Sequence, residues 1–271
     1  MKNICCICER KTDMIDRDGI TKALTATLEP LPYIHALWLE GADANGMVDE
    51  YSDIDFWIDF DDEQENNAIA AVEEALARIG EIDLMEVLSH PHPKIRQRIY
   101  HLAGTSEFLM LDVCWQCHSR GDEIVFITGS NVENAQVLFD KSNVVRWKDY
   151  DPEDDADTHE EVITSCQYRY GQHSRVLKYI RRGLYLETYA YYNQYILNPL
   201  IDLLRVLYTP ANTDYTLCHI SHHIPADARV KLEWFAQIAS LDDIEMRLEP
   251  ARAWFNELVG ATVGRPTQRK E

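Results

Sequence analysis

Hydrophobic and polar positions follow two different patterns along this chain, and the pattern changes near the middle. From residue 54 to residue 60 every second side chain is apolar, and this period of two predicts a strand with carboxylates on its other face. Further strands are predicted at 33–40, 81–88, 108–115, 124–128 and 136–139, and helices at 13–29, 63–79 and 94–102. The first 145 residues therefore mix strands with helices.

The second half of the chain has helical spacing. Apolar residues recur at steps of three to five positions from Val176 to Leu207, and Asn198-Pro199 predicts a kink in that helical stretch. Segments 217–224, 226–239 and 241–259 continue the helical pattern. We therefore expect an α+β protein with two domains. A small mixed β-sheet with flanking helices is predicted over 1–148, followed by an all-α helical bundle over 149–271.

Negative charge is concentrated in two stretches. The chain has 46 acidic and 26 basic residues, a formal net charge of −20, and residues 49–65 and 149–161 contain no Lys or Arg. Such a balance argues against a protein that binds bulk nucleic acid or an anionic membrane, although a local site with a divalent cation can still hold a nucleotide. The second stretch includes Asp151-Pro152 and no apolar cluster, which predicts a solvated connection.

Signals for a compartment are few. No window approaches the roughly 20 apolar residues that a membrane span needs, and the N-terminus lacks the pattern of a secretory signal. The seven cysteines include Cys5, Cys6 and Cys8, whose crowded spacing is not typical of a disulfide framework. Cys114-x-x-Cys117-His118 has the spacing of zinc ligands, but no second spaced pair accompanies it, so we expect no structural zinc there. A cytoplasmic location is the simplest expectation.

Two carboxylates separated by one residue carry the strongest chemical signal. Asp53 and Asp55 lie two positions apart at the strand predicted around 54–60, so both side chains point the same way. Paired carboxylates repel unless a cation lies between them, and oxygen ligands suit Mg²⁺ or Mn²⁺. Asp112 stands in the otherwise apolar segment 108–115, where a buried carboxylate is costly without a partner. If the two strands are neighbours, Asp112 completes a three-carboxylate metal site.

A glycine upstream of these carboxylates adds a second signal, because Gly41 before a helix allows a phosphate to approach backbone N–H groups. The order of a strand, Gly41-Ala42, Asp53-Ile54-Asp55 and a later strand with Asp112 resembles the nucleotidyltransferase superfamily. Within it, the aminoglycoside-type adenylyltransferases also carry a helical bundle after the core. The similarity to that group extends over most of the chain, including 101–114 and 192–225.

This resemblance implies the transfer of a nucleoside monophosphate, AMP from ATP, to a hydroxyl of a small molecule such as an aminoglycoside-like acceptor. The cofactor it implies is Mg²⁺ or Mn²⁺, and the partners are a nucleoside triphosphate and a hydroxyl-bearing acceptor, with neither bulk nucleic acid nor membrane. The residues it assigns to catalysis and metal binding are Asp53, Asp55 and Asp112. The residues it assigns to nucleotide binding are Gly41, Ala42, Ser52 and Lys178.

Two departures from the pattern of the superfamily leave other functions open. Ala42 replaces the serine that usually follows the motif glycine, although Ser52 offers a hydroxyl nearby in the sequence. Cys218 stands near a position where relatives often carry a basic residue. One alternative is therefore a nucleotide- or ligand-binding regulatory protein on the same scaffold that has lost catalysis. Another is an enzyme that transfers AMP to a protein side chain, as antitoxin-type members of the superfamily do.

Overall fold

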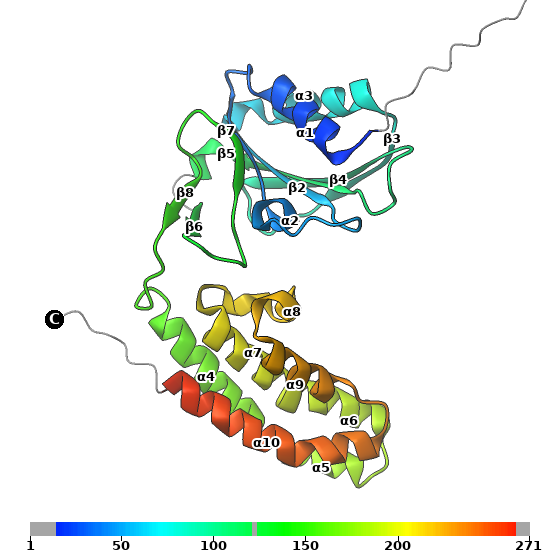
Figure 1. The fold of residues 1–271 in the computed structure, drawn as a ribbon, viewed down its shortest axis with the longest axis vertical. Coiled ribbons are helices and arrows are strands. Elements are labelled where there is room, and N and C mark those ends of the chain that lie inside the picture. The colour runs from blue at the N-terminus through cyan, green and yellow to red at the C-terminus, as the bar shows by residue number, and fades with distance from the viewer. Residues whose placement is uncertain (1–14, 121–123, 264–271) are drawn as a thin grey trace, which may run out of the picture. The chain divides into compact units, whose positions relative to one another are not determined.

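The computed structural model describes residues 15–120 and 124–263, and it divides the chain into two units at residue 148 (Figure 1). The first unit reaches Lys148 and the second begins at Asp149. Strands lie in the first unit and helices alone make up the described part of the second. The α+β class expected from the sequence is confirmed.

The main sheet of the first unit has the strand order β3-β4-β5-β2-β1-β7. Strands β2 and β5 run parallel, and every other neighbouring pair in this sheet is antiparallel. A two-stranded parallel sheet of β6 and β8 lies beside it. The strands are β1 (Ile34–Leu39), β2 (Ile54–Phe60), β3 (Ile82–Leu88), β4 (Ile95–Leu102), β5 (Leu111–Cys117), β6 (Val125–Ile127), β7 (Gln136–Asp140) and β8 (Arg146–Lys148).

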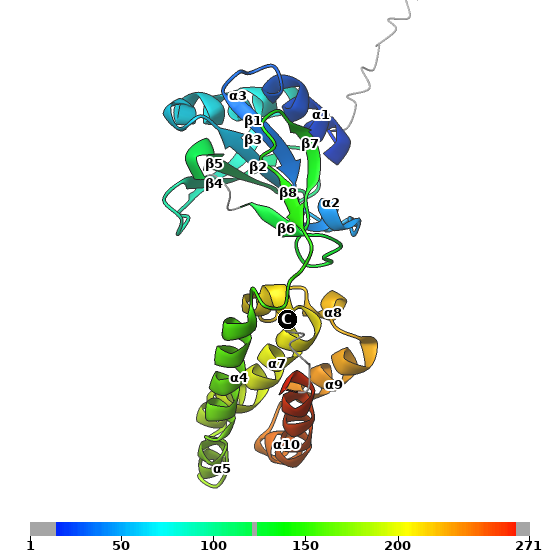
Figure 2. The same ribbon diagram turned by 90° about the vertical axis from the view of Figure 1, so that its left-hand side faces the viewer.

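Two helices cover one face of the sheet. Helices α1 (Arg17–Leu28) and α3 (Glu65–Ile79) lie side by side over it, whereas α2 (Gly41–Asn45) lies on the other side (Figures 1 and 2). The even-numbered residues of β2, from Ile54 to Phe60, are buried in one core with apolar residues of α1 and α3. Consequently the odd-numbered residues of β2 point to the opposite face. A second small apolar cluster on that face includes Trp38 and Phe126.

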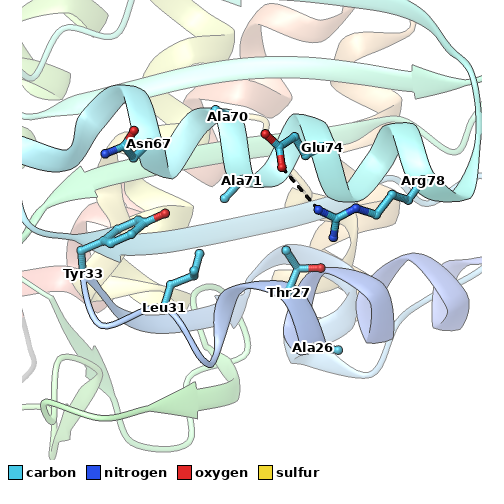
Figure 3. A pocket seen from close by; sticks show the side chains of 9 residues that line it. All are labelled: Ala26, Thr27, Leu31, Tyr33, Asn67, Ala70, Ala71, Glu74 and Arg78. Carbon is cyan, nitrogen blue, oxygen red and sulfur yellow. Dashed lines mark hydrogen bonds and ion pairs between the residues drawn. The ribbon is translucent and has the colours of Figure 1, made fainter.

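A groove of about 500 Å³ lies between the two covering helices (Figure 3). Its lining includes Thr27 of α1 and Asn67 of α3, and the ion pair between Arg78 and Glu74 runs along one side, with Nη2 and Oε2 3.3 Å apart. The groove is therefore on the helical side of the sheet. The carboxylates singled out by the sequence lie on the other side.

The expectation of a helix at 94–102 is wrong, because residues Ile95–Leu102 form the strand β4. This strand pairs with β3 on one side and β5 on the other. The two arginines on the face that meets α3 are held by glutamates of that helix: Arg98 by Glu73 and Arg96 by Glu65. These partners are remote in sequence, so the local pattern of apolar positions does not show that this face is covered.

The described part of the second unit is a set of packed helices. Helices α4 (Ala156–Tyr170) and α10 (Leu241–Val263) both pack on α7 (Asn198–Tyr208). The remaining helices are α5 (Ser174–Ile180), α6 (Tyr185–Tyr192), α8 (Ile220–His223) and α9 (Ala226–Ala236). The expected distortion at Asn198-Pro199 takes the form of a π-helical turn at Asn193–Leu197, directly before α7. No helix in the described ranges has the length and apolarity to cross a membrane.

Candidate metal and nucleotide site

The predicted carboxylates meet at the junction of β2 and β5. Asp55 and Asp112 are direct partners in the register of these two parallel strands. Asp53 directly precedes β2 and lies on the same face as Asp55 by the alternation of the strand. Asp53 is exposed, whereas Asp55 and Asp112 are partly buried. The sequence predicted a three-carboxylate group on the condition that the two strands are neighbours. The structure meets this condition and brings the three acids together.

The electrostatics of this cluster disfavour a full set of negative charges. Burial, followed by the charges of Asp53 and Asp112, raises the pKa of Asp55 to about 7. Burial also raises the pKa of Asp112, against the hydrogen bond from Gln97 that lowers it. A cation among these oxygens would remove both penalties, since it offsets the mutual repulsion and replaces lost hydration.

Gly41 approaches the cluster more closely than any other residue type could. It begins the short helix α2 with a φ of 59°, and a Cβ atom at this position would lie 2.1 Å from Oδ2 of Asp55. The backbone N–H of Glu40 donates to the carbonyl of Asp55 at 3.0 Å, which ties the two segments together. Glycine is therefore required here both by its backbone conformation and by the space that Asp55 occupies.

An arginine that the sequence did not single out lies beside the cluster. Nη1 of Arg17, at the start of α1, is 2.6 Å from Oδ2 of Asp43, and the side chain of this arginine also donates to the carbonyl of Ser52. Its positive charge acts on Asp55 as well, in the direction that lowers the pKa. Arg17 and Asp43 are 26 positions apart, and no local motif marks this pair.

Two further side chains near the site were also missed. Nε2 of Gln97 donates to both carboxylate oxygens of Asp112, at 2.9 and 2.8 Å, from the neighbouring strand β4. Glu40 accepts a hydrogen bond from Nε1 of Trp38 at 2.9 Å. Burial, with contributions from Glu133 and Asp55, raises the pKa of Glu40 to about 7. Because segment 94–102 was expected to be a helix, the sequence could not place Gln97 opposite the carboxylate.

The residues expected to bind nucleotide are spread over both units. Gly41 and Ala42 open helix α2 next to Asp55, in the first unit. The hydroxyl of Ser52 closes a local turn by donating to Asp49 at 2.9 Å and accepting from its backbone N–H at 3.0 Å. Lys178 belongs to α5 of the second unit, where its ammonium lies 5.6 Å from the ring centre of Tyr179.

The cysteines of β5 do not form a joint ligand set. Cys114 follows Asp112 on the same face of the strand, and Sγ is 4.0 Å from Oδ1 of that carboxylate. Cys117 lies three positions further and packs into the core with α1 and α3. Three residues along a strand reverse the direction of the side chain, so the two thiols point to opposite faces. His118 takes part in a different group of side chains.

No protein-family model matches the chain, and no curated protein is detectably similar to it in sequence. Several solved structures are similar to it, and two of them are described here. An aminoglycoside 6-adenyltransferase from Bacillus subtilis has 13% sequence identity and a TM-score of 0.38, over 93% of this chain and 89% of that one. A spectinomycin adenyltransferase from an Enterococcus, solved with ATP and spectinomycin, has 9% identity and a TM-score of 0.31, over 92% of this chain and 100% of that one. Both of those proteins are adenyltransferases.

Proposed function

We propose that the first unit binds Mg²⁺ or Mn²⁺ through Asp53, Asp55 and Asp112, and that the chain transfers a nucleoside monophosphate, AMP from ATP, to a hydroxyl group. The observation that carries this function is the pairing of Asp55 with Asp112 in adjacent parallel strands, with Asp53 on the same face. Three carboxylates on one face of a sheet, two on adjacent strands and one directly before β2, form an all-oxygen donor set, which suits these hard cations.

The residues present fit such a cation in two respects. The pKa of Asp55 is raised to about 7 by burial and by its acidic neighbours, so the site without a cation holds its negative charge poorly. In addition, a Cβ atom at position 41 would collide with the carboxylate of Asp55, so glycine at that position keeps this side of the carboxylate open. When bound, the cation neutralises charge on the triphosphate and on the departing pyrophosphate.

The side chains of this unit supply the remaining chemistry. Asp112 accepts the proton of the acceptor hydroxyl, and burial favours this role because it raises the pKa of the carboxyl group. The acceptor oxygen forms a bond to the α-phosphorus while the bond from that phosphorus to the β-phosphate bridging oxygen breaks, and pyrophosphate leaves. Gln97 holds both oxygens of Asp112 and thereby fixes the orientation of the base.

The nucleotide contacts follow from the same arrangement. Backbone N–H groups at Gly41 and Ala42 bind the terminal phosphates, and glycine at position 41 keeps that approach open. Ser52 contributes its hydroxyl after releasing Asp49, its partner in the structure. Lys178 of α5 stays a proposed nucleotide-binding residue on the resemblance of the sequence alone. The acceptor is a small hydroxyl-bearing molecule, and the acidic surroundings favour a cationic one, such as an aminoglycoside-like compound.

A ligand-binding protein without catalysis is the second candidate, and two observations favour it. Ala42 has no hydroxyl beside the motif glycine, and the hydroxyl of Ser52 is already engaged with Asp49. Such a protein would bind Mg²⁺-ATP through the same carboxylates and release no pyrophosphate. A protein acceptor, as in antitoxin-type members, is the third candidate and differs from the first only in the molecule that receives AMP.

One set of measurements separates these candidates. ATP is titrated into the purified chain with and without Mg²⁺, and pyrophosphate release is then followed with a panel of aminoglycosides and other polyols. Mg²⁺-dependent binding with release that depends on an acceptor supports the transferase. Binding without release across the panel supports the ligand-binding protein, and radiolabelled AMP on a polypeptide supports the protein acceptor. Absence of Mg²⁺-dependent nucleotide binding contradicts all three candidates.

A further inference from the structure

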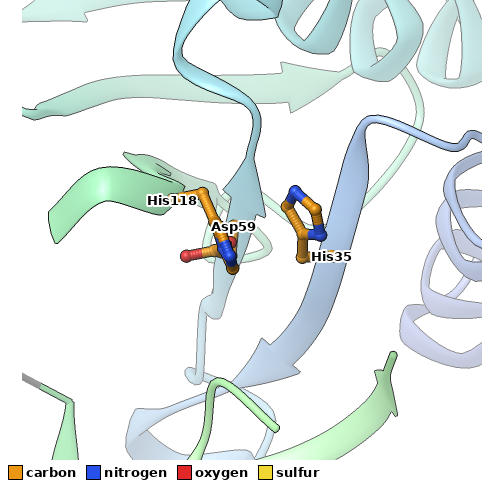
Figure 4. A group of neighbouring side chains, drawn as sticks. All are labelled: His35, Asp59 and His118. Atoms are coloured by element: carbon orange, nitrogen blue, oxygen red, sulfur yellow. The ribbon is translucent and has the colours of Figure 1, made fainter. Parts of the chain in front are cut away.

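A second group of potential metal ligands lies on the first unit, away from the three carboxylates. His35 of β1, Asp59 of β2 and His118 directly after β5 each offer a ligand atom, and these atoms lie within 4.8 Å of one another. Figure 4 shows the three side chains together where β1 begins and β2 ends. We propose that His35, Asp59 and His118 bind Zn²⁺ or another first-row divalent cation that prefers imidazole ligands.

The donor set distinguishes this group from the carboxylate site. Two imidazole nitrogens and one carboxylate oxygen are typical ligands of zinc, whereas Mg²⁺ prefers oxygen alone. Asp59 is four residues beyond Asp55 on β2, which corresponds to about 13 Å along a strand. The two groups therefore bind different cations at separate places on the same sheet.

The geometry already approaches that of a zinc site. Nδ1 of His118 is 2.6 Å from Oδ1 of Asp59, and the rings of His35 and His118 stack with centroids 3.9 Å apart. Tetrahedral Zn²⁺ with bonds of about 2.0–2.2 Å needs ligand atoms about 3.3–3.6 Å apart. For the pair of His118 and Asp59 the required adjustment is thus about 1 Å, and His118 can make it because its side chain is 44% exposed.

Neighbouring residues hold two of these ligands by hydrogen bonds. One nitrogen of His35 lies 2.7 Å from Oδ1 of Asp61 and the other lies 3.0 Å from the hydroxyl of Ser142. Nε2 of Gln116 donates to the second oxygen of Asp59 at 2.6 Å. A cation bound by one nitrogen of His35 replaces one of these two hydrogen bonds, and the partner of the other nitrogen keeps the ring in place. Such partners commonly orient metal-binding histidines and strengthen binding.

Asp59 itself indicates a need for positive charge. Its carboxylate is almost fully buried, with 1% of the residue exposed. A buried carboxylate requires compensation. The described neighbours provide an amide and two imidazoles, which carry a positive charge only when protonated. A divalent cation would supply that charge permanently, and it would connect β1, β2 and the turn after β5.

The test measures Zn²⁺ binding by the full chain rather than activity. Cys5, Cys6 and Cys8 lie outside the described residues, so all three are replaced by serine in every protein used. After removal of metal with a chelator, Zn²⁺ is titrated in competition with a chromophoric chelator, in millimolar Mg²⁺ so that the carboxylate site is saturated. Co²⁺ then serves as a spectroscopic probe, because visible ligand-field bands without a thiolate charge-transfer band identify a tetrahedral nitrogen and oxygen site.

We expect one equivalent of Zn²⁺ with micromolar or tighter affinity, weakened about hundredfold or more in His35→Ala, His118→Ala and Asp59→Asn. His101→Ala is the matched control. Nδ1 of His101 is also 2.6 Å from an aspartate, Asp83, but among the described residues His101 belongs to no such cluster. Circular dichroism verifies folding of each variant, and His118→Gln replaces any His118→Ala protein that does not fold.

Three results would overturn this assignment. The first is no Zn²⁺ binding in the micromolar range by the parent, and the second is unchanged affinity in both histidine variants. The third is loss of binding in one histidine variant only, because the cation would then have other ligands. None of these results depends on nucleotide binding or turnover, so failure here leaves the carboxylate site untouched.

Discussion

Oδ2 of Asp55 occupies the space that a Cβ atom on residue 41 would need, at 2.1 Å from its ideal position. The glycine at the start of α2 and the central carboxylate of β2 therefore depend on each other. Gly46 at the end of the same helix also has a positive φ, 66° against 59° for Gly41, but nothing lies within 4 Å of its missing Cβ.

This pair of glycines gives the first prediction. Gly41→Ala displaces the carboxylate of Asp55 and weakens Mg²⁺-dependent nucleotide binding at least tenfold, whereas Gly46→Ala keeps the affinity of the parent. Both variants suffer the backbone strain of alanine at positive φ, about 1 kcal/mol. Isothermal titration with Mg²⁺-ATP measures the difference between them. Equal losses in the two variants would show that strain in α2, and not the position of Asp55, controls binding.

The second prediction concerns stability and pH. The pKa of Asp55 is raised to about 7 in the folded chain, whereas in the unfolded chain the pKa has its ordinary value of 3.8. Between these values the folded state binds more protons, so the contribution of Asp55 to stability falls as the pH rises and stays low above pH 7. Asp55→Asn should therefore stabilise the metal-free chain at pH 8 by about 1–3 kcal/mol and leave it nearly unchanged at pH 4.

Thermal unfolding of the metal-free protein at the two pH values measures this effect. Asp18→Asn is the control, because the side chain of Asp18 is 81% exposed on α1. Mg²⁺ should raise the unfolding temperature of the parent at pH 8 and have little effect on Asp55→Asn. A variant no more stable than the parent at pH 8 would mean that Asp55 is not electrostatically strained.

The third prediction separates the roles of the carboxylates. Asp112→Asn can keep a hydrogen bond to Gln97 after an amide flip, but it removes the base. Turnover should therefore fall at least hundredfold, whereas nucleotide affinity should change much less. Single-turnover rates and equilibrium titrations on the same preparation measure the two quantities. Parallel losses of affinity and turnover would instead make Asp112 a residue that organises the site.

The fourth prediction uses Ala42. Ala42→Ser adds a hydroxyl beside the motif glycine, and a hydrogen bond to a charged phosphate oxygen contributes roughly 1.5–3 kcal/mol, so affinity for ATP should rise about ten- to a hundredfold. Tighter binding with faster pyrophosphate release indicates a competent transferase that lacks one contact, and tighter binding without release indicates a ligand-binding protein. Unchanged affinity would mean that the phosphates of the bound nucleotide do not lie beside Gly41.

The sequence predicted the strand β2 over its full length, because four apolar residues at every second position admit one interpretation. It also placed Asp53 and Asp55 on one face, which follows from the same alternation. The prediction of a helix at 94–102 was wrong for a physical reason. Arg96 and Arg98 are compensated by Glu65 and Glu73 of α3, and such long-range ion pairs leave no trace in a local pattern.

The residues of the site that were not predicted from the sequence also depend on contacts between remote segments of the chain. Arg17 reaches Asp43, and Gln97 reaches Asp112, only after the sheet has formed. His35 and His118 likewise come together through the order β5-β2-β1. Contacts between strands depend on register and strand order, and a single sequence specifies neither of these directly.

The most direct test of the carboxylate site compares Mg²⁺-ATP binding by the parent with binding by Asp53→Asn and Asp55→Asn. Each variant removes one anionic ligand, keeps the shape of the side chain and relieves repulsion in the metal-free state, so the fold persists while binding is lost. Isothermal titration should show Mg²⁺-dependent affinity in the parent and a loss of at least tenfold in both variants. If both variants bind Mg²⁺-ATP as tightly as the parent, Asp53 and Asp55 do not form the metal site.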